Sequence, residues 1–120
     1  MWWIVTRLIT KHFFTRSKKR AGFNKKTTRE FYNKAIIRGL RIESFESRPL
    51  FFKYLKSITR PNCHIIIYNR YILICSDTNI AITLLNLPKE YYSLVDSIRK
   101  IKKEERNNDV AKHPNYKRSS

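Results

Sequence analysis

The chain has 120 residues, 42% of them hydrophobic, which is enough for one folded domain and too few for a second. Its 26 Lys and Arg against 9 Asp and Glu leave a net charge of +17, which predicts a polyanionic partner, nucleic acid above all. Only two glycines are present, which excludes a glycine-rich phosphate loop and the nucleotide hydrolases that depend on one.

Cysteine usage and the amino terminus indicate the cytoplasm. Cys63 and Cys75 lie in apolar runs without the short paired spacing of a zinc site, so they are predicted to be reduced, buried thiols. The apolar opening of the chain meets Arg7 and Lys11 too early to span a bilayer, and it lacks a signal-peptide cleavage site. We therefore expect a soluble, cytoplasmic protein without stable membrane insertion, metal or cofactor.

The first half of the chain is predicted to form three short helices. Each combines apolar residues at helical spacing with a start or stop signal. Gly22 ends the first helix, a capping box formed by Thr27 and Glu30 opens the second, and Pro49 opens the third. The helices are expected at about Thr6–Arg20, at Thr27–Gly39, and from Ser47 to a point before Pro61.

The second half changes to β-strands and then returns to helix. β-Branched and aromatic residues dominate 63–68, 71–75 and 80–85, and turn residues separate these runs, which predicts an antiparallel meander of three to four strands. A last helix begins near Pro88 and continues to about Glu104. The predicted fold is α+β, with N-terminal helices, the meander and a C-terminal helix in a single basic domain, 1–104, followed by a disordered polar tail, 105–120.

The positive charge is concentrated in the helical half. Residues 1–62 contain 16 of the basic and 3 of the acidic residues, so this half alone carries +13 and is expected to hold the phosphate-facing surface. Its aromatic side chains could stack unpaired bases, although most of them are needed for the core. The residues predicted to bind nucleic acid are Lys18, Lys19, Arg20, Lys25, Lys26 and, from the sheet, Tyr68.

His12, Arg16 and Arg20 are spaced four residues apart, which places them on one face of the first predicted helix. RNA can be cleaved without a metal when a base removes the 2′-hydroxyl proton and a cation stabilises the charged phosphorane. His is suited to proton transfer near neutral pH. The alternative is that His12 is an ordinary helix residue and the arginines only bind phosphate, and the spacing alone leaves both interpretations open.

Two hydroxyl side chains of the predicted sheet are further candidates. Alternation along the last strand places Thr83 on one face with Ala81, where a buried hydroxyl needs a hydrogen-bond partner. The alternative is that Thr83 is simply a good strand former and that Tyr68 lies at the core edge with its hydroxyl in water. His64 and His113 are expected to be structural or exposed.

Four segments follow one another along the chain: 9–23 with its His and Arg residues, the helix end at 35–39, the apolar run 65–75, and the strand 80–88. In this order they resemble the barnase, EndoU, colicin and RelE superfamily of small ribonucleases. In the phage and mobile-element branches of that superfamily, an early helix carries a His followed by Arg residues, and a late strand reads similarly to Leu-Ile-Thr-Val-x-x-Leu-Pro. The counterparts here are His12, Arg16, Arg20 and Thr83.

The resemblance implies a metal-independent endoribonuclease, toxin-like or belonging to a phage or mobile element, with an antitoxin or immunity protein as a further partner. His12 would transfer protons, Arg16 and Arg20 would stabilise the phosphate, and Thr83 would hydrogen-bond the phosphate or orient His12. The chain departs from the pattern in having no acidic base near Thr83. The alternatives are a non-catalytic RNA- or DNA-binding protein and a phage or mobile-element accessory protein.

Overall fold

The computed structural model describes residues 9–112, with side chains as far as Glu105. Its elements, in chain order, are α2 (Lys11–Ala21), α3 (Lys25–Arg38), β1 (Leu40–Arg41), a 3-10 turn η1 (Ile42–Phe45), α4 (Pro49–Ile58), β2 (Cys63–Tyr68), β3 (Tyr71–Ser76), β4 (Ala81–Asn86), a 3-10 turn η2 (Lys89–Tyr91) and α5 (Tyr92–Lys112). They form two compact units that meet in the sequence between Pro88 and Lys89. The predicted α+β class is confirmed.

The sheet is an antiparallel meander in the order β1-β2-β3-β4. The three predicted strands are confirmed to within one residue at each end. The fourth strand, β1, has only two residues, which is too short for a periodic pattern to reveal. In the turns after β2 and β3, Asn69 and Asn79 have positive φ angles of 53° and 66°. Asn tolerates this conformation, and in a chain with only two glycines it occupies turn positions where glycine is common.

A β-bulge decides which residues of β4 share a face. The pairing of β3 with β4 shifts between Ile74, opposite Thr83, and Cys75, opposite Ala81. One extra residue is thereby inserted in β4, and the alternation of its side chains is broken. Ala81 joins the core cluster that contains Leu84 and Cys75, whereas Thr83 lies on the opposite face with Ile74. The prediction that Ala81 and Thr83 share a face is wrong, because strict alternation requires a continuous register.

The described part of the first helix begins at Lys11 because Thr10 caps it. Thr10 is extended, and its Oγ1 accepts a hydrogen bond from the Phe13 amide at 3.1 Å. A helix continuous from Thr6 is therefore excluded, although Thr6 itself lies outside the described residues. Gly22 ends the helix with a left-handed φ of 72°, as predicted.

The second helix begins earlier than predicted. Asn24 is its N-cap, and the Oδ1 atom of Asn24 accepts a hydrogen bond from the Thr27 amide at 2.8 Å, so the predicted capping box does not form the start. Gly39 follows the helix as predicted, with an ordinary φ of −67°. This position requires space, because a Cβ atom there would overlap the Ile66 side chain and the Ala35 carbonyl. The glycine lets α3 pack closely on β2.

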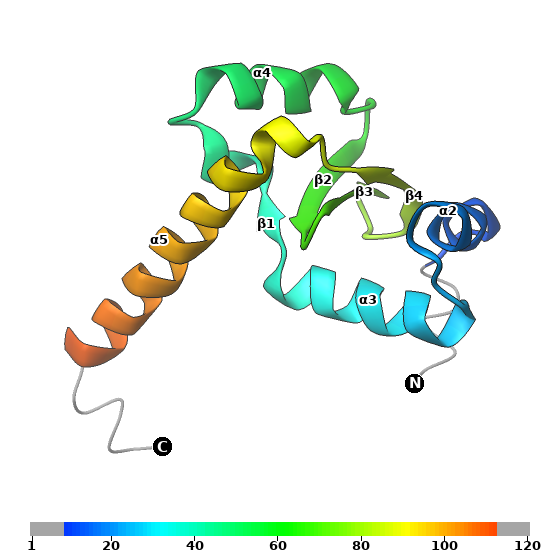
Figure 1. The fold of residues 1–120 in the computed structure, drawn as a ribbon, viewed down its shortest axis with the longest axis horizontal. Coiled ribbons are helices and arrows are strands. Elements are labelled where there is room, and N and C mark those ends of the chain that lie inside the picture. Colours follow the sequence, from blue (N-terminus) through cyan, green and yellow to red (C-terminus); the bar gives the residue numbers. More distant parts are fainter. Residues whose placement is uncertain (1–8, 113–120) are drawn as a thin grey trace. The chain divides into compact units, whose positions relative to one another are not determined.

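Figure 1 shows α3 and α4 on opposite sides of the sheet. Phe31 and Ala35 of α3 pack in a cluster with sheet residues such as Ile66. On α4, Phe51 and Leu55 are fully buried, but the apolar Leu50 is 82% exposed. The sheet is thus covered by helices on both faces, which leaves its edges as the positions where other elements attach.

The second unit consists of η2 and α5. The helix runs to Lys112, so it continues through residues that were predicted to begin a polar tail, and residues from 113 onward, including His113, lie outside the described part. Two exposed i, i+3 ion pairs lie along it, Asp96 with Arg99 and Lys102 with Glu105, each at 3.9 Å. Within residues 9–112, no helix combines the length and hydropathy that a membrane crossing requires.

Candidate nucleic-acid interface

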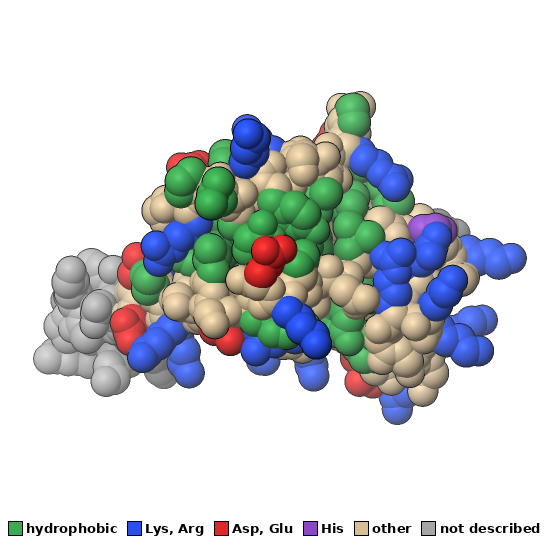
Figure 2. Space-filling view, turned by 45° about the horizontal axis from the view of Figure 1, so that its top comes forward, with side chains coloured by type: hydrophobic (Ala, Val, Ile, Leu, Met, Phe, Trp, Pro, Cys, Tyr) green, Lys and Arg blue, Asp and Glu red, His purple; other side chains and the backbone are tan. Residues whose placement is uncertain are grey.

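The helices α2 and α3 together carry ten Lys and Arg residues and one acidic residue, Glu30. We call their solvent-facing side the α2–α3 surface. The four lysines predicted to bind phosphate are all exposed on it: Lys18, Lys19, Lys25 and Lys26. Figure 2 shows Lys and Arg side chains gathered around a histidine at the right-hand end of the view, where Figure 1 places α2. With so few acidic neighbours, this surface attracts anions.

Three hydrogen bonds fix α2 along the open edge of β4. The Thr10 amide donates to the Ala81 carbonyl at 3.0 Å, the Thr10 hydroxyl donates to the Ile82 carbonyl at 3.1 Å, and Arg20 Nη1 donates to the Leu84 carbonyl at 2.6 Å. An edge strand leaves such carbonyls unpaired, and here the helix binds them in place of a fifth strand. Arg20, predicted to bind phosphate, therefore has a structural role that engages at least one of its nitrogens.

His12 and Arg16 lie in contact on the exposed side of α2. Arg16 Nε donates to His12 Nε2 at 3.4 Å, which requires a lone pair on that imidazole nitrogen. The predicted i, i+4 spacing thus brings these two side chains together, while Arg20 turns inward to β4. An imidazole beside a guanidinium can remove a proton from a bound substrate while the guanidinium stabilises the negative charge that develops there.

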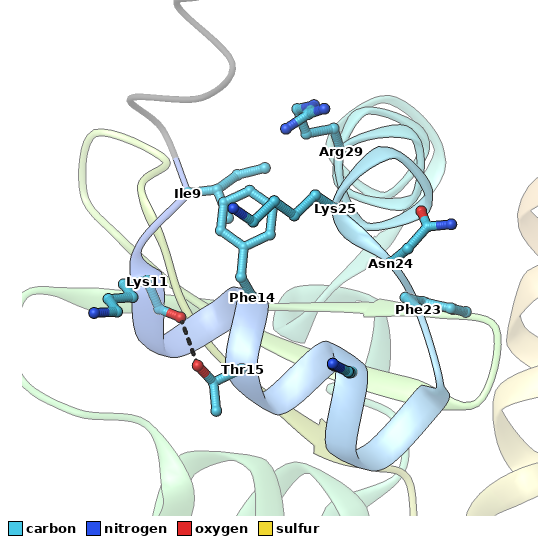
Figure 3. Close-up of a pocket in the computed structure, with 9 residues that line it drawn as sticks. Ile9, Lys11, Phe14, Thr15, Phe23, Asn24, Lys25 and Arg29 are labelled. Atoms are coloured by element: carbon cyan, nitrogen blue, oxygen red, sulfur yellow. Dashed lines mark hydrogen bonds between the residues drawn. The ribbon is translucent and has the colours of Figure 1, made fainter.

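A pocket of about 710 Å³ opens between α2 and α3, and we call it the α2–α3 pocket. Its lining residues come from both helices and the turn between them: Ile9, Lys11, Phe14, Thr15, Lys18, Phe23, Asn24, Lys25 and Arg29. In Figure 3 the Phe14 ring projects from α2 into this space beside Ile9, and Lys25 and Arg29 approach it from α3. The pocket combines an apolar floor with cationic side chains around it.

The floor of the α2–α3 pocket continues into an aromatic cluster. Phe23 packs against Phe31 and Tyr71 with ring centroids 5.2 and 5.9 Å apart, and Phe31 packs against Tyr68 at 5.4 Å. Edge and tilted contacts of this kind stabilise rings beyond the burial of their area. Phe14 lies partly buried against the same core. The floor is therefore held in place by the sheet.

Thr83 belongs to the core, and Tyr68 lies at its edge. Thr83 is only 4% exposed, so its hydroxyl presents almost no surface to a phosphate. Its strand does lie beside α2, as the hydrogen bond from Arg20 to Leu84 demonstrates. Tyr68 is half-buried against Phe31. Of the predicted catalytic set, the structure brings together His12 and Arg16 and leaves Thr83 buried in the neighbouring strand.

A second group of titratable residues, which the sequence did not single out, lies around His64. His64 pairs with Cys75 across β2 and β3, and its Nε2 is buried without a hydrogen-bond partner in the described part of the chain. Burial, assisted by the charge of Arg41, lowers the pKa of His64, while a hydrogen bond with Asn79 opposes that shift. We call these residues, with Tyr32, the His64 cluster.

Two further members of the His64 cluster, Cys75 and Tyr32, have raised pKa values. Burial raises the pKa of the Cys75 thiol to about 12 and that of the Tyr32 hydroxyl to about 12. The Tyr32 hydroxyl donates to the Asn79 carbonyl at 2.5 Å. These residues are far apart in the sequence, and only the pairing of the strands together with the packing of α3 on the sheet brings them together.

Within the described residues, no group of three or more His, Cys, Asp or Glu side chains is placed to hold a metal ion. Cys63 and Cys75 are free thiols. No family model, curated protein or solved structure matches this chain. The resemblance to the small ribonucleases therefore stays a prediction that depends on the segments quoted above.

Proposed function

We propose that this chain binds RNA through the α2–α3 surface. The observation that supports this function most is the excess of ten Lys and Arg residues over one acidic residue on two packed helices. Cations that neutralise phosphates release counterions from the nucleic acid, and this release supplies most of the free energy of non-specific binding. RNA is favoured over duplex DNA because half-buried aromatic rings accompany the charge, and unpaired bases can use them.

The proposal is tested by removing two positive charges from α2 and, in a control variant, two positive charges from α5. The variant Lys18→Gln/Lys19→Gln is expected to weaken RNA binding on the order of 10-fold at 0.1 M salt and to reduce the salt slope by roughly 1.4, about 0.7 for each lost contact to a single strand. The matched control, Lys100→Gln/Lys103→Gln, removes the same charge from exposed positions of α5. Fluorescence anisotropy with a labelled RNA strand over a salt series measures both quantities.

Equal losses in the two variants would contradict the proposal. Binding would then follow the net charge of the protein and not a surface on α2 and α3. A circular dichroism melt of each variant verifies that the fold is retained, which is expected because all four lysines are exposed.

A second candidate function, metal-independent endoribonuclease activity, is favoured by the contact between His12 and Arg16. In this mechanism, His12 removes the proton of the 2′-hydroxyl, which attacks the adjacent phosphate, and Arg16 stabilises the charge that develops on the phosphorane. The bond between phosphorus and the 5′ oxygen breaks, the leaving oxygen takes a proton from water, and a 2′,3′-cyclic phosphate remains. Thr83 is too buried to bind the phosphate without a local movement of β4.

This activity is tested by incubating RNA with the protein in EDTA. The wild type is expected to produce fragments with 2′,3′-cyclic ends, and His12→Ala is expected to be roughly 10²- to 10⁴-fold slower. Bound but uncut RNA from the wild type would eliminate the nuclease and leave the binding function in place.

A further inference from the structure

The α2–α3 pocket is placed within the surface to which we assign RNA binding, but its lining differs from the rest of that surface. Lysines alone, as at Lys19 and Lys26, are sufficient to hold phosphates. The pocket adds Phe14 and Phe23, and its volume of about 710 Å³ lies in the range that ligand sites occupy, about 300–1,000 Å³. An apolar floor is of no use to a phosphate, so it indicates that part of the ligand is apolar and flat.

We propose that the α2–α3 pocket receives one unpaired nucleobase of a bound RNA strand, stacked on Phe14, with the phosphates on either side of that base held by Lys11, Lys18 and Lys25. This inference rests on the proposed RNA-binding function and specifies the form of RNA that is bound. A base has a π face that can stack on an aromatic ring, and its own phosphates carry the negative charge that the surrounding lysines require.

The pocket is built to keep its shape without a ligand. The left-handed Gly22 and the Asn24 cap fix the turn between the two helices. Phe23 is held from below by Phe31 and Tyr71. The hydrogen bond from Arg20 to β4 fixes α2 to the sheet. A preformed pocket loses little conformational entropy when a base enters, which favours binding.

The position of Phe14 between two helices restricts which nucleic acids can reach it. In a duplex, each base is stacked between its neighbours and paired, so it presents only an edge. Entry into the pocket would require that the base be unstacked and unpaired, which costs a few kcal/mol. A single strand has already lost these interactions, so the pocket is expected to favour single strands over duplexes of the same sequence.

The experiment compares two proteins with two ligands. The proteins are the wild type and Phe14→Leu, which keeps an apolar side chain at a half-buried position and so preserves the contact with the core. The ligands are a 12-nucleotide polyuridine strand and an abasic strand of equal length, which has the same phosphates without bases. Fluorescence anisotropy at 0.1 M salt measures the four affinities, and melts by circular dichroism verify the fold.

The wild type is expected to bind the base-bearing strand roughly 5- to 100-fold more tightly than the abasic strand, and Phe14→Leu is expected to lose most of that difference. Both proteins are expected to bind the abasic strand equally. Equal affinity of the wild type for the two strands would overturn the inference. If binding to both strands still falls in Lys18→Gln/Lys19→Gln, the proposed function survives that result.

Both proposals would be overturned if Lys18→Gln/Lys19→Gln bound RNA as tightly as the wild type and the wild type bound the two strands with equal affinity. An anionic vesicle of phosphatidylglycerol is a separate probe of the same pocket. Vesicle binding that depends on Phe14, combined with equal binding of the two strands, would assign the pocket to a lipid chain and would overturn the base-binding inference.

Discussion

The two described histidines each lie near an arginine, in opposite surroundings. His12 is on the exposed side of α2 with Arg16 Nε at 3.4 Å from its Nε2. His64 lies in β2 near Arg41, with a buried Nε2 that has no hydrogen-bond partner among the described residues, and with a lowered pKa. The same pair of residue types is thus placed once on an exposed helix face and once in the sheet, where His64 is half-buried and its Nε2 is covered.

This difference separates the part of the first unit that is available to bind a ligand from the part that maintains the fold. The α2–α3 surface is open, basic and lined by side chains that can change partners. The His64 cluster is more buried, since Tyr32 and Cys75 lie in the core and His64 is half-buried, and burial raises the pKa of Tyr32 and that of Cys75. We therefore expect substitutions in the open region to change binding with little effect on stability, and substitutions near the closed region to do the reverse.

The largest expected effect is the difference between the two glycines, Gly39 beside the packed core and Gly22 in the turn between α2 and α3. Gly39→Ala is expected to lower the free energy of unfolding by about 3 kcal/mol, because the new Cβ overlaps Ile66 and Ala35 in a packed core. Gly22→Ala meets no atom within 4 Å and changes only the cost of a left-handed φ, about 1 kcal/mol. Urea unfolding followed by circular dichroism measures both values. Similar losses in the two variants would contradict the contrast between the regions.

The next-largest effect distinguishes Arg20 from Arg16, which were predicted to lie on the same face of α2. Arg20→Ala is expected to lower the free energy of unfolding by about 1.5 kcal/mol, because it removes a charged hydrogen bond to the Leu84 carbonyl at the edge of β4. Arg16→Ala removes only an exposed contact and is expected to change stability by less than about 0.5 kcal/mol. Thermal melts of the pair test this division, and it fails if Arg16→Ala is as destabilised as Arg20→Ala.

The smallest expected effect is a dependence of stability on pH that comes from His64. Its pKa is lowered in the folded chain, so between that value and the unfolded value of about 6.5 the unfolded chain holds the extra proton. The free energy of unfolding is therefore expected to be highest above about pH 6.5 and to fall as the pH drops below it. Arg41 adds to this effect, and Asp77 and Glu43 oppose it.

Urea unfolding between pH 5 and 7 measures that dependence. His64→Gln is expected to flatten the profile. A profile that stays as steep in His64→Gln as in the wild type would contradict the assignment of this dependence to His64.

Local sequence patterns predicted much of the fold because the elements are short and clearly bounded. The runs at 63–68 and 71–75 correspond to β2 and β3 nearly residue by residue, since β-branched side chains and turn-forming Asn residues mark their limits. The starts of α2 and α3 were less predictable. Thr10 and Asn24 act as caps, and an alternative cap at Thr27 fits the same sequence rules.

The candidate site was predictable only in part. The spacing of His12 and Arg16 was sufficient to place them in contact, because both lie on one helix. The roles of Arg20 and Thr83 were not, since one depends on a hydrogen bond to a strand 64 residues away and the other on a bulge in that strand. The α2–α3 pocket could not be predicted, because its existence depends on the angle between two helices, which no local sequence pattern specifies.

The sequence by itself determined the α+β class, the meander and the concentration of charge in the helical half, because periodicity and composition act through near neighbours. The tertiary structure alone decided which aromatic rings form the floor of the α2–α3 pocket, which arginine binds the edge of β4, and which histidine is half-buried. These outcomes depend on distances between segments remote in the chain: one residue of register in β4 moves a side chain from one face of the sheet to the other, and the missing Cβ at Gly39 lets α3 pack closely on β2.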